Sequence, residues 1–416
     1  MNKLTIGKIL IFICGLFFSE VVYAQYLPSD WQSSVAAGQG NAFTAWANDG
    51  SSIFYNPAGL SLLHNKRSKN IVSDARSPIP DEIEANEQML NKIQYNPQDW
   101  TENLLDSAKA NPGKPSYLSM QAFPYLVFGG KNSLTFLIGV PVRSENSAVF
   151  LDAASPNNAT VNSINTASVA FAIADSTALG GFRWGISVRP NHRTQYENNA
   201  LDYNGTLSTK SYADTIGDDG TKTTAVALDA GFMATLSDYW FPTIGASVRN
   251  IPTGCVDNYI DPITFKLETM CGTVRHGGTD LSPNESRVDP TEVRAGVSVT
   301  PRGHIGRNIV NLRLSADVFP IPISSKNKNY GIPSVEPADL VHIGGELFFG
   351  SALAKSNFSL RGGYMNQEPT WGGTINLSLL MIGYSSYVAT SAVQNSLDVI
   401  QKNTERRHMV YLGWQL

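Results

Sequence analysis

The chain has 416 residues, of which 42% are apolar and only 16% charged, against roughly 25% charged residues in an average soluble domain. This composition argues against a disordered chain and a coiled coil, and a formal net charge of −4 without a basic block argues against a nucleic-acid partner. The length suits two or three soluble domains or one large β-barrel.

Residues 1–24 have the features of a secretory signal peptide. Lys3 and Lys8 give a positive start, residues 9–18 are continuously apolar, and Ala24 is a small residue where cleavage is expected. The apolar run is too short to span a membrane as a helix, so we expect cleavage and export rather than a membrane anchor. A lipoprotein anchored at Cys14 is disfavoured because no small residue precedes it.

Residues 25–61 differ from everything that follows, because they are rich in small side chains and lack alternation. Residues 36–47 are expected to form a short helix, and the pair Asn56–Pro57 predicts a turn. A segment with such small side chains is compact enough to occupy the lumen of a barrel as a plug.

Residues 62–416 contain repeated stretches in which apolar and polar residues alternate, the pattern of a β-strand with two different faces. Such stretches predict fourteen strands, near residues 66–76, 116–128, 132–145, 162–175, 180–195, 222–236, 239–251, 288–300, 308–320, 338–350, 356–366, 370–379, 381–390 and 405–416.

The connections between these strands alternate in length. Those after odd-numbered strands are mostly long, and those after even-numbered strands are short. Short turns at one end and long loops at the other are typical of outer-membrane barrels, whereas a soluble β-sandwich has no reason to sort its loops. The sequence therefore predicts an all-β fold, a 14-stranded antiparallel transmembrane β-barrel in the outer membrane of a Gram-negative-type bacterium.

Within the first long loop, near residues 80–110, apolar residues recur at helical spacing at Ile83, Met89, Leu90 and Ile93. We expect a helix in an extracellular loop. It would serve as an apolar capture site for a lipid-like molecule, as a lid on the barrel mouth, or as a partner surface.

Two local features interrupt the barrel pattern. Pro141, close to Gly139, falls within the third strand, where proline removes a ladder hydrogen bond and is typical of edges or bulges. Cys255 and Cys271 lie in a long loop with only His276 nearby, which favours a disulfide over a metal site in an exported protein.

The polar faces of the strands carry charges that would be costly against lipid, so we assign them to the lumen. They form either a structural charge network or an ion- or solute-selecting ring. These residues are Arg183, Arg189, Asp229, Arg249, Arg294, Arg313, Asp317, Glu346 and Arg361, and we expect Arg294, Asp317, Glu346 and Arg361 to lie side by side.

The chain ends in an apolar strand, with Val410, Leu412, Trp414 and Leu416 on one face. Such a strand is what barrels present to the barrel assembly machinery. The sequence contains no hydrolase, zinc-protease or phosphate-loop motif, so we expect neither an enzyme nor a cofactor, and no catalytic or metal site.

The stretch from residue 38 to residue 60 resembles the N-terminal hatch of the FadL-type long-chain fatty acid transporters and of the related PorV-type proteins of type IX secretion. The matching residues are Gly38, Gly40, Ala42, Asn56, Pro57 and Ala58. Residues 342–350 and 360–365 resemble late strands of the PorV-like branch.

This resemblance implies a fourteen-stranded barrel with a luminal hatch that passes hydrophobic small molecules, such as long-chain fatty acids. It also implies that Gly139 and Pro141 form a strand kink that opens a sideways exit into the membrane, with a bulge of no functional consequence as the alternative. Two alternatives stay open: a PorV-like component with a secretion-system partner, and a plain diffusion porin.

Overall fold

In the computed structural model of the chain, the described residues are 31–63, 72–76, 82–90, 100–129, 134–150, 158–177, 181–202, 212–237, 240–260, 267–277, 288–305, 308–322, 340–350, 356–377, 380–394 and 400–414. The predicted signal peptide lies outside them. Within these ranges, no helix has the length and apolar character needed to cross a membrane.

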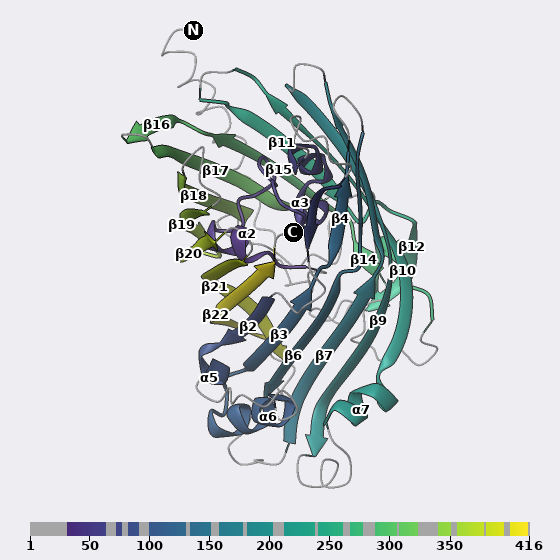
Figure 1. The fold of residues 1–416 in the computed structure, drawn as a ribbon. Coiled ribbons are helices and arrows are strands. Elements are labelled where there is room, and N and C mark those ends of the chain that lie inside the picture. The colour runs from purple at the N-terminus through teal and green to yellow at the C-terminus, as the bar shows by residue number, and fades with distance from the viewer. Residues whose placement is uncertain are drawn as a thin grey trace.

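The strands form a closed antiparallel barrel of fourteen strands, which confirms the predicted fold class (Figure 1). The first four strands are each divided in two: β1 (Val72–Arg76) with β2 (Glu82–Asn86), β3 (Ser116–Ala122) with β4 (Tyr125–Phe128), β5 (Thr135–Gly139) with β6 (Val142–Val149), and β7 (Asn158–Ser168) with β8 (Ala170–Ser176). The others are β9 (Phe182–Asp202), β10 (Thr221–Thr235), β11 (Thr243–Arg249), β15 (Glu292–Val299), β17 (Asn308–Pro322), β18 (Val341–Gly350), β19 (Ser356–Met365), β20 (Glu368–Leu377), β21 (Leu380–Gln394) and β22 (Ile400–Trp414).

The ring closes where the last strand meets the first. β22 pairs with β2 from Glu82 opposite Tyr411 to Asn86 opposite Arg407. Where β2 and β22 pair, the barrel has no free sheet edge. A barrel in lipid requires this because unpaired backbone groups cannot bond to water there.

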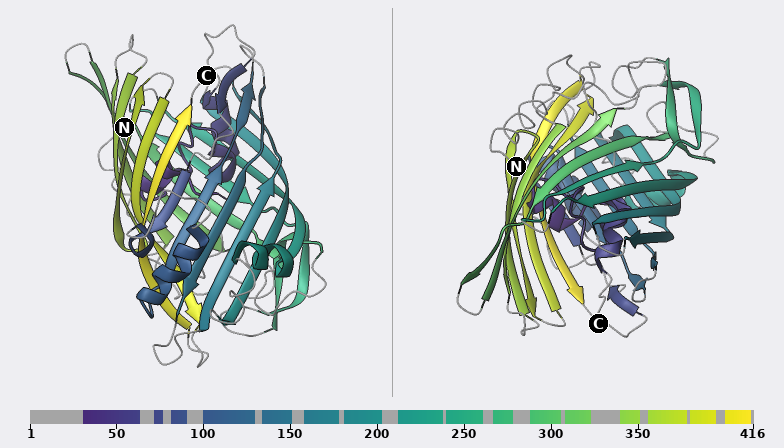
Figure 2. Two further views of the ribbon diagram at one scale, coloured as in Figure 1. Left: turned by 60° about the horizontal axis from the view of Figure 1, so that its bottom comes forward. Right: turned by 90° about the horizontal axis from the view of Figure 1, so that it is seen from above.

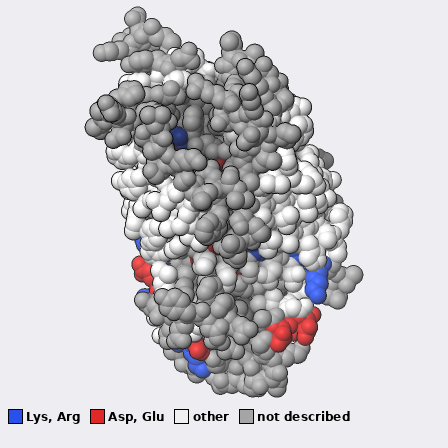
Figure 3. Space-filling model, in the orientation of Figure 1, with Lys and Arg blue, Asp and Glu red and all other residues white. Residues whose placement is uncertain are grey.

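The two faces of each strand differ as the alternation predicted. On β9, Phe182, Trp184, Ile186 and Val188 are 36–43% exposed on the outer face, whereas Arg189 on the inner face is 1% exposed. On the face shown in Figure 3, the described surface is largely uncharged across its middle, and most of the charged residues lie toward the lower end.

The remaining elements lie mostly at the two ends. β16 (Arg302–Ile305) pairs with β17, and β12 (Gly254–Ile260), β13 (Leu267–Val274) and β14 (Val288–Pro290) form a small separate sheet. Three helices, α5 (Glu87–Leu90), α6 (Trp100–Ala110) and α7 (Tyr212–Asp219), lie at the end of the barrel that carries the long loops (Figure 2, left).

The expected helix of the first long loop begins later than predicted. Ile83 lies in strand β2, since the polar residues on either side of it face the lumen and the strand pairs with β3 and β22. Helix α5 includes Met89 and Leu90, α6 follows from Trp100, and Ile93 lies outside the described residues. The helical spacing of the apolar residues was therefore misleading at its start.

These helices cover the outer wall of the barrel rather than its mouth. Tyr117 on β3 points into the lumen, so its neighbour Leu118 points outward, yet Leu118 is only 1% exposed because Met89, Leu104 and Leu105 belong to the same apolar cluster. Tyr196 of β9 and Ile216 of α7 extend this cluster around the wall. Of the apolar side chains proposed for capture, Met89 is therefore used in packing and Ile83 partly so, whereas Leu90 is 43% exposed.

Cys255 and Cys271 lie opposite each other in the β12–β13 ladder, and the structure joins their sulfur atoms in a disulfide. The bond links the two strands of one hairpin, so it holds the hairpin together rather than tying it to the barrel.

Candidate functional site

The lumen of the barrel is the candidate site, and residues 31–63, here called the lumen segment, lie within it (Figure 2, right). The lumen segment contains α2 (Ser34–Gly38), α3 (Ser52–Tyr55), the short 3-10 helix η1 (Pro57–Gly59) and α4 (Leu60–Leu63). Almost all of its residues are buried, because it contacts the inner faces of strands on several sides of the ring.

On one side the lumen segment is held by apolar packing. Trp31 and Phe54 stack on each other and meet the ring of Phe123 at centroid distances of 5.6 and 5.4 Å. Leu137 and Met233 of the wall belong to the same cluster, and both are almost completely buried. Burial of this kind stabilises the segment through the hydrophobic effect.

Glycines allow close approach on the opposite side. Gly40 has φ +62°, and a Cβ placed on it would lie 2.5 Å from the Ile343 carbonyl oxygen and 2.7 Å from the Tyr364 nitrogen. A Cβ on Gly38 would lie 3.3 Å from the Cα of Gly372. The small residues that distinguish this part of the sequence are therefore required by backbone contact with β18, β19 and β20.

The Asn56–Pro57–Ala58 turn docks on the wall through the amide of Asn56. Its Nδ2 donates to the carbonyl oxygens of Thr44, at 2.8 Å, and Phe232 of β10, at 3.0 Å. Its Oδ1 accepts from the Ala58 amide at 3.1 Å, and Pro57 lies against the backbone of Gly185. Asn56 therefore joins the turn, the rest of the lumen segment and the wall.

Among the predicted lumen charges, Glu346 pairs with two arginines. Arg313 and Arg361, from the strands on either side, contact its two carboxylate oxygens at 2.8 and 2.9 Å. The Arg313 guanidinium also lies 4.4 Å from the ring centroid of Trp46, so the charged wall contacts the lumen segment directly.

Asp317 was expected to lie beside Arg294 and Glu346, but its hydrogen-bond partners are in the lumen segment. Its Oδ2 accepts from the backbone amides of Phe43, at 2.7 Å, and Thr44, at 2.6 Å. Arg294 instead pairs with Glu292 at 3.3 Å and lies over the ring of Phe319. The predicted group is thus divided: Glu346 and Arg361 lie together, whereas Asp317 holds the lumen segment.

The other lumen charges form ion pairs or hydrogen bonds inside the barrel. Arg189 contacts Asp229 at 2.7 Å, and Arg249 contacts Glu292 at 3.2 Å. Arg183 donates to the Thr235 hydroxyl at 3.1 Å. The described lumen wall therefore combines ion pairs with the apolar cluster around Phe123.

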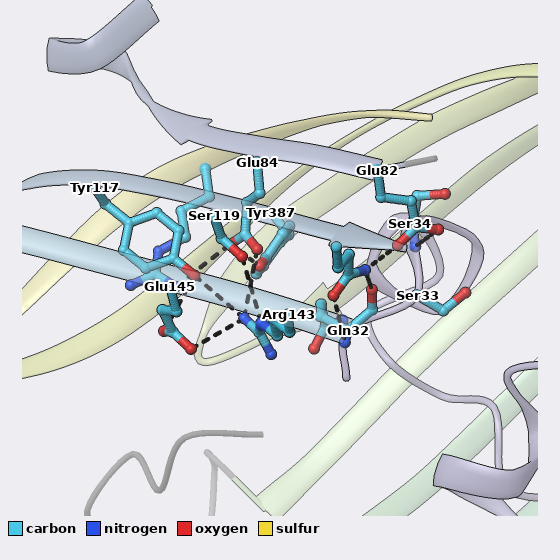
Figure 4. Close-up of polar contacts among 12 residues, drawn as sticks. Gln32, Ser33, Ser34, Glu82, Glu84, Tyr117, Ser119, Arg143, Glu145 and Tyr387 are labelled. Atoms are coloured by element: carbon cyan, nitrogen blue, oxygen red, sulfur yellow. Dashed lines mark hydrogen bonds and ion pairs between the residues drawn. The ribbon is translucent and has the colours of Figure 1, made fainter. Parts of the chain in front are cut away.

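A second charged network was not predicted, because its carboxylates lie in the segment assigned to a loop helix. Glu84 of β2 lies 3.7 Å from Arg143 and 3.3 Å from Arg407, and Tyr387 also donates to it. Figure 4 shows Arg143 among Glu84, Tyr117 and other side chains of the neighbouring strands. The alternation of Glu82, Glu84 and Asn86 is the signal from which an inward strand face could have been predicted.

Hydrogen bonds of Gln32 and Ser34 connect the beginning of the lumen segment to β2 and β3. The Ser34 amide donates to Glu82 at 3.4 Å, and Gln121 of β3 donates both to Glu82 and to the Gln32 carbonyl oxygen (Figure 4). The seam that closes the ring is therefore bonded to the segment that fills it.

The third strand breaks where the sequence placed a kink, between Gly139 at the end of β5 and Val142 at the start of β6. The break is bridged on both sides: Val140 donates to the Pro124 carbonyl oxygen at 3.0 Å, and Ser168 donates to that of Pro141 at 2.9 Å. Between β7 and β8, the Val169 amide donates to the carbonyl oxygen of Pro190 on β9 at 3.0 Å. Prolines in three strands thus mark one line across the wall.

Among the residues that the structure describes, no group of three or more histidine, cysteine or acidic side chains is arranged to hold a metal ion.

No protein-family model matches this sequence, and no relative is found among curated proteins. Solved structures with a similar course of the chain include the P. putida toluene transporter TodX, with 10% sequence identity, a TM-score of 0.48, and coverage of 93% of this chain and 99% of TodX. The CymD monoaromatic hydrocarbon channel has 11% identity, a TM-score of 0.46, and coverage of 94% and 98%. CdiB from Acinetobacter baumannii has 9% identity, a TM-score of 0.33, and coverage of 83% and 60%.

Replacing Asp317 with alanine is expected to loosen the lumen segment without unfolding the barrel. The change removes the acceptor of two amide hydrogen bonds to a charged group, each worth about 1.5–3 kcal/mol. With the other five tryptophans replaced by phenylalanine, Trp31 and Trp46 report on the segment, and their fluorescence transition on heating is expected at a lower temperature. Asp219→Ala on the exposed face of α7 serves as the control. An unchanged transition in Asp317→Ala would contradict the anchoring role.

Replacing Glu346 with glutamine is expected to destabilise the barrel by about 3 kcal/mol, because removing one partner of a buried pair leaves the other charges uncompensated. The measurement is equilibrium unfolding in detergent. Glu368→Gln is a matched control, since Glu368 is 49% exposed and 3.9 Å from Arg406, and surface pairs contribute about 0–1 kcal/mol. Equal effects of the two substitutions would show that Glu346 is not a structural centre of the lumen.

Proposed function

We propose that the chain is an outer-membrane channel that takes up hydrophobic small molecules, with long-chain fatty acids as the first class to test. The apolar outer face of the closed barrel and the confinement of charges to its interior support a position in outer-membrane lipid. After export, the barrel assembly machinery would insert the chain, for which the apolar last strand is suited.

The lumen segment, which corresponds to the predicted hatch, supports this proposal most directly. Gly38, Gly40 and the Asn56–Pro57–Ala58 turn all contact the barrel wall, and the described contacts between segment and wall are noncovalent. A barrel that serves only for diffusion of polar solutes gains nothing from an interior filled in this way. A removable plug, in contrast, suits selective passage.

The line of strand breaks supports release into the membrane. Proline cannot donate to a ladder, so the wall at Pro124, Pro141 and Pro190 is held by fewer hydrogen bonds than a regular sheet. Gly139 packs tightly there, since a Cβ on it would lie 2.8 Å from the Pro124 carbonyl oxygen. In the proposed mechanism a hydrophobic molecule leaves sideways at this line, which avoids the aqueous periplasm.

A secretion or surface-assembly component is the second candidate, and the ion-paired lumen favours it. Arginine–carboxylate pairs lie on the lumen wall, and such a surface is unfavourable for binding a hydrophobic molecule. In that case the barrel would be a scaffold for a secretion-system partner. Uptake of radiolabelled oleate and toluene by cells with and without the protein separates the two, since a scaffold leaves uptake unchanged.

Deleting residues 33–58 is expected to leave a folded barrel and to open the lumen, because every strand of the ring lies after residue 71. Conductance in a planar bilayer is expected to rise well above that of the intact protein. The control is the full chain purified in the same way. If both forms conduct equally, these residues do not occlude the pore.

Replacing Pro141 with alanine restores a backbone donor at the break in the third strand. If the break is the exit, oleate uptake is expected to fall, while thermal stability holds or rises by about 1 kcal/mol, the net value of one hydrogen bond. Pro322→Ala, at the far end of β17, is the control for an added donor. Unchanged uptake by a folded Pro141→Ala protein would remove this site from the mechanism.

A further inference from the structure

A second interruption of the wall lies in the extracellular half, between β10 and β14. β10 pairs with β9 over its whole length, from Thr221 to Ala234, but with β11 only from Ala230 to Thr235. After β11 the chain turns at Asn250, which has φ +51°, and the Ile251 amide donates to the Leu228 carbonyl oxygen. Beyond that bond, β10 no longer has β11 as a neighbour.

The disulfide-linked hairpin β12–β13 fills the missing part of the wall. β13 pairs with β14 over three residues, from Gly272 to Val274, and its continuation reaches β10 at one isolated bridge. At this bridge Thr224 and His276 exchange two backbone hydrogen bonds, of 2.8 and 2.7 Å. Within the described residues this is the only backbone ladder between β10 and the hairpin, whereas β10 and β9 share fourteen register pairs.

A buried side chain holds the hairpin from inside. Arg275 contacts Asp289 of β14 at 2.6 Å, Asn191 of β9 at 2.9 Å and Thr223 of β10 at 2.9 Å. Its side chain is fully buried, and Arg193 of β9 contacts the other oxygen of Asp289 at 2.8 Å. One arginine thus connects the hairpin to three strands.

The backbone next to this arginine is adapted to the contact. Gly277 has φ +97°, and a Cβ on it would lie 2.9 Å from the Lys222 carbonyl oxygen of β10. On the other edge, a Cβ on Gly272 would lie 2.2 Å from the Asp289 carbonyl oxygen. The hairpin is therefore shaped to lie between β10 and β14, yet few backbone hydrogen bonds keep it there.

We propose that the β12–β13 hairpin is a side door in the outer-leaflet half of the barrel, through which hydrophobic molecules enter the lumen from the membrane. The proposal rests on the proposed uptake function. The outer face beside the door is apolar, since Val226 is 50% exposed and Val188 36% exposed. When Arg275 and the Thr224–His276 bridge release, the hairpin moves as one unit, because the Cys255–Cys271 disulfide keeps its two strands together.

Locking the door tests this proposal. Thr224→Cys with His276→Cys places cysteines on a directly opposed, hydrogen-bonded pair, where the spacing suits a disulfide. Ala234→Cys with Ile244→Cys, a register pair in the continuous β10–β11 ladder, is the matched control. Both variants retain the Cys255–Cys271 disulfide, so reduction opens that bond equally in the two.

Uptake of radiolabelled oleate and toluene is measured in oxidised and reduced cells, with cross-linking and folding checked by gel mobility. The oxidised Thr224–His276 variant is expected to lose at least fivefold in uptake and to recover on reduction, while the control variant changes less than twofold. Equal uptake by the locked and reduced forms overturns the door, and so does an equal loss in both variants. If wild-type cells take up neither probe, the proposed function fails instead.

Hydrogen exchange tests the same motion without transport. The Thr224 and His276 amides are expected to exchange at least tenfold faster in Arg275→Ala than in the wild type, while amides of residues 230–234 stay unchanged. If Arg275→Ala leaves the exchange of both amides at the wild-type rate, the hairpin is a fixed part of the wall and the door is overturned.

Discussion

A closed ring of antiparallel strands places one face of every strand against an apolar surround and the other against a narrow interior, and the whole structure depends on satisfying that inner face. Charges confined there need partners at once, because unpaired buried charges are strongly unfavourable. Pairs such as Arg189 with Asp229, and Glu346 with two arginines, meet this requirement within the wall. Asp317 meets it by accepting hydrogen bonds from backbone amides of the lumen segment, so the segment helps to satisfy the inner face of the barrel.

Much of this could be read from the sequence, because period-two alternation reports directly on the two faces of a strand. Phe182, Trp184 and Arg189 lie on the sides that alternation assigned to them. The strand number followed from the same pattern, together with the lengths of the connections. The small residues around Gly40 indicated close packing in the lumen, although not the strands against which they pack.

The errors have a common physical origin in contacts between residues far apart in the chain. The amide of Phe43 and the carboxylate of Asp317 are 274 positions apart, so no local pattern could pair them. Glu82 and Glu84 looked like the polar start of a loop helix because the strand they belong to is only five residues long. Its pairing with the last strand, which stabilises it, is equally distant in sequence.

The lumen segment is held by two kinds of contact that have different consequences. Apolar packing of Trp31 and Phe54 on Phe123 excludes water over a broad area, and it retains most of its free energy after a small shift. Hydrogen bonds to Asp317 and from Asn56 are directional and weaken steeply when their geometry changes. The apolar side therefore supplies adhesion, and the polar side fixes one position. If the lumen segment is the proposed plug, release of the two bonds to Asp317 would free it near Phe43 and Thr44, while the apolar cluster would keep it in the barrel.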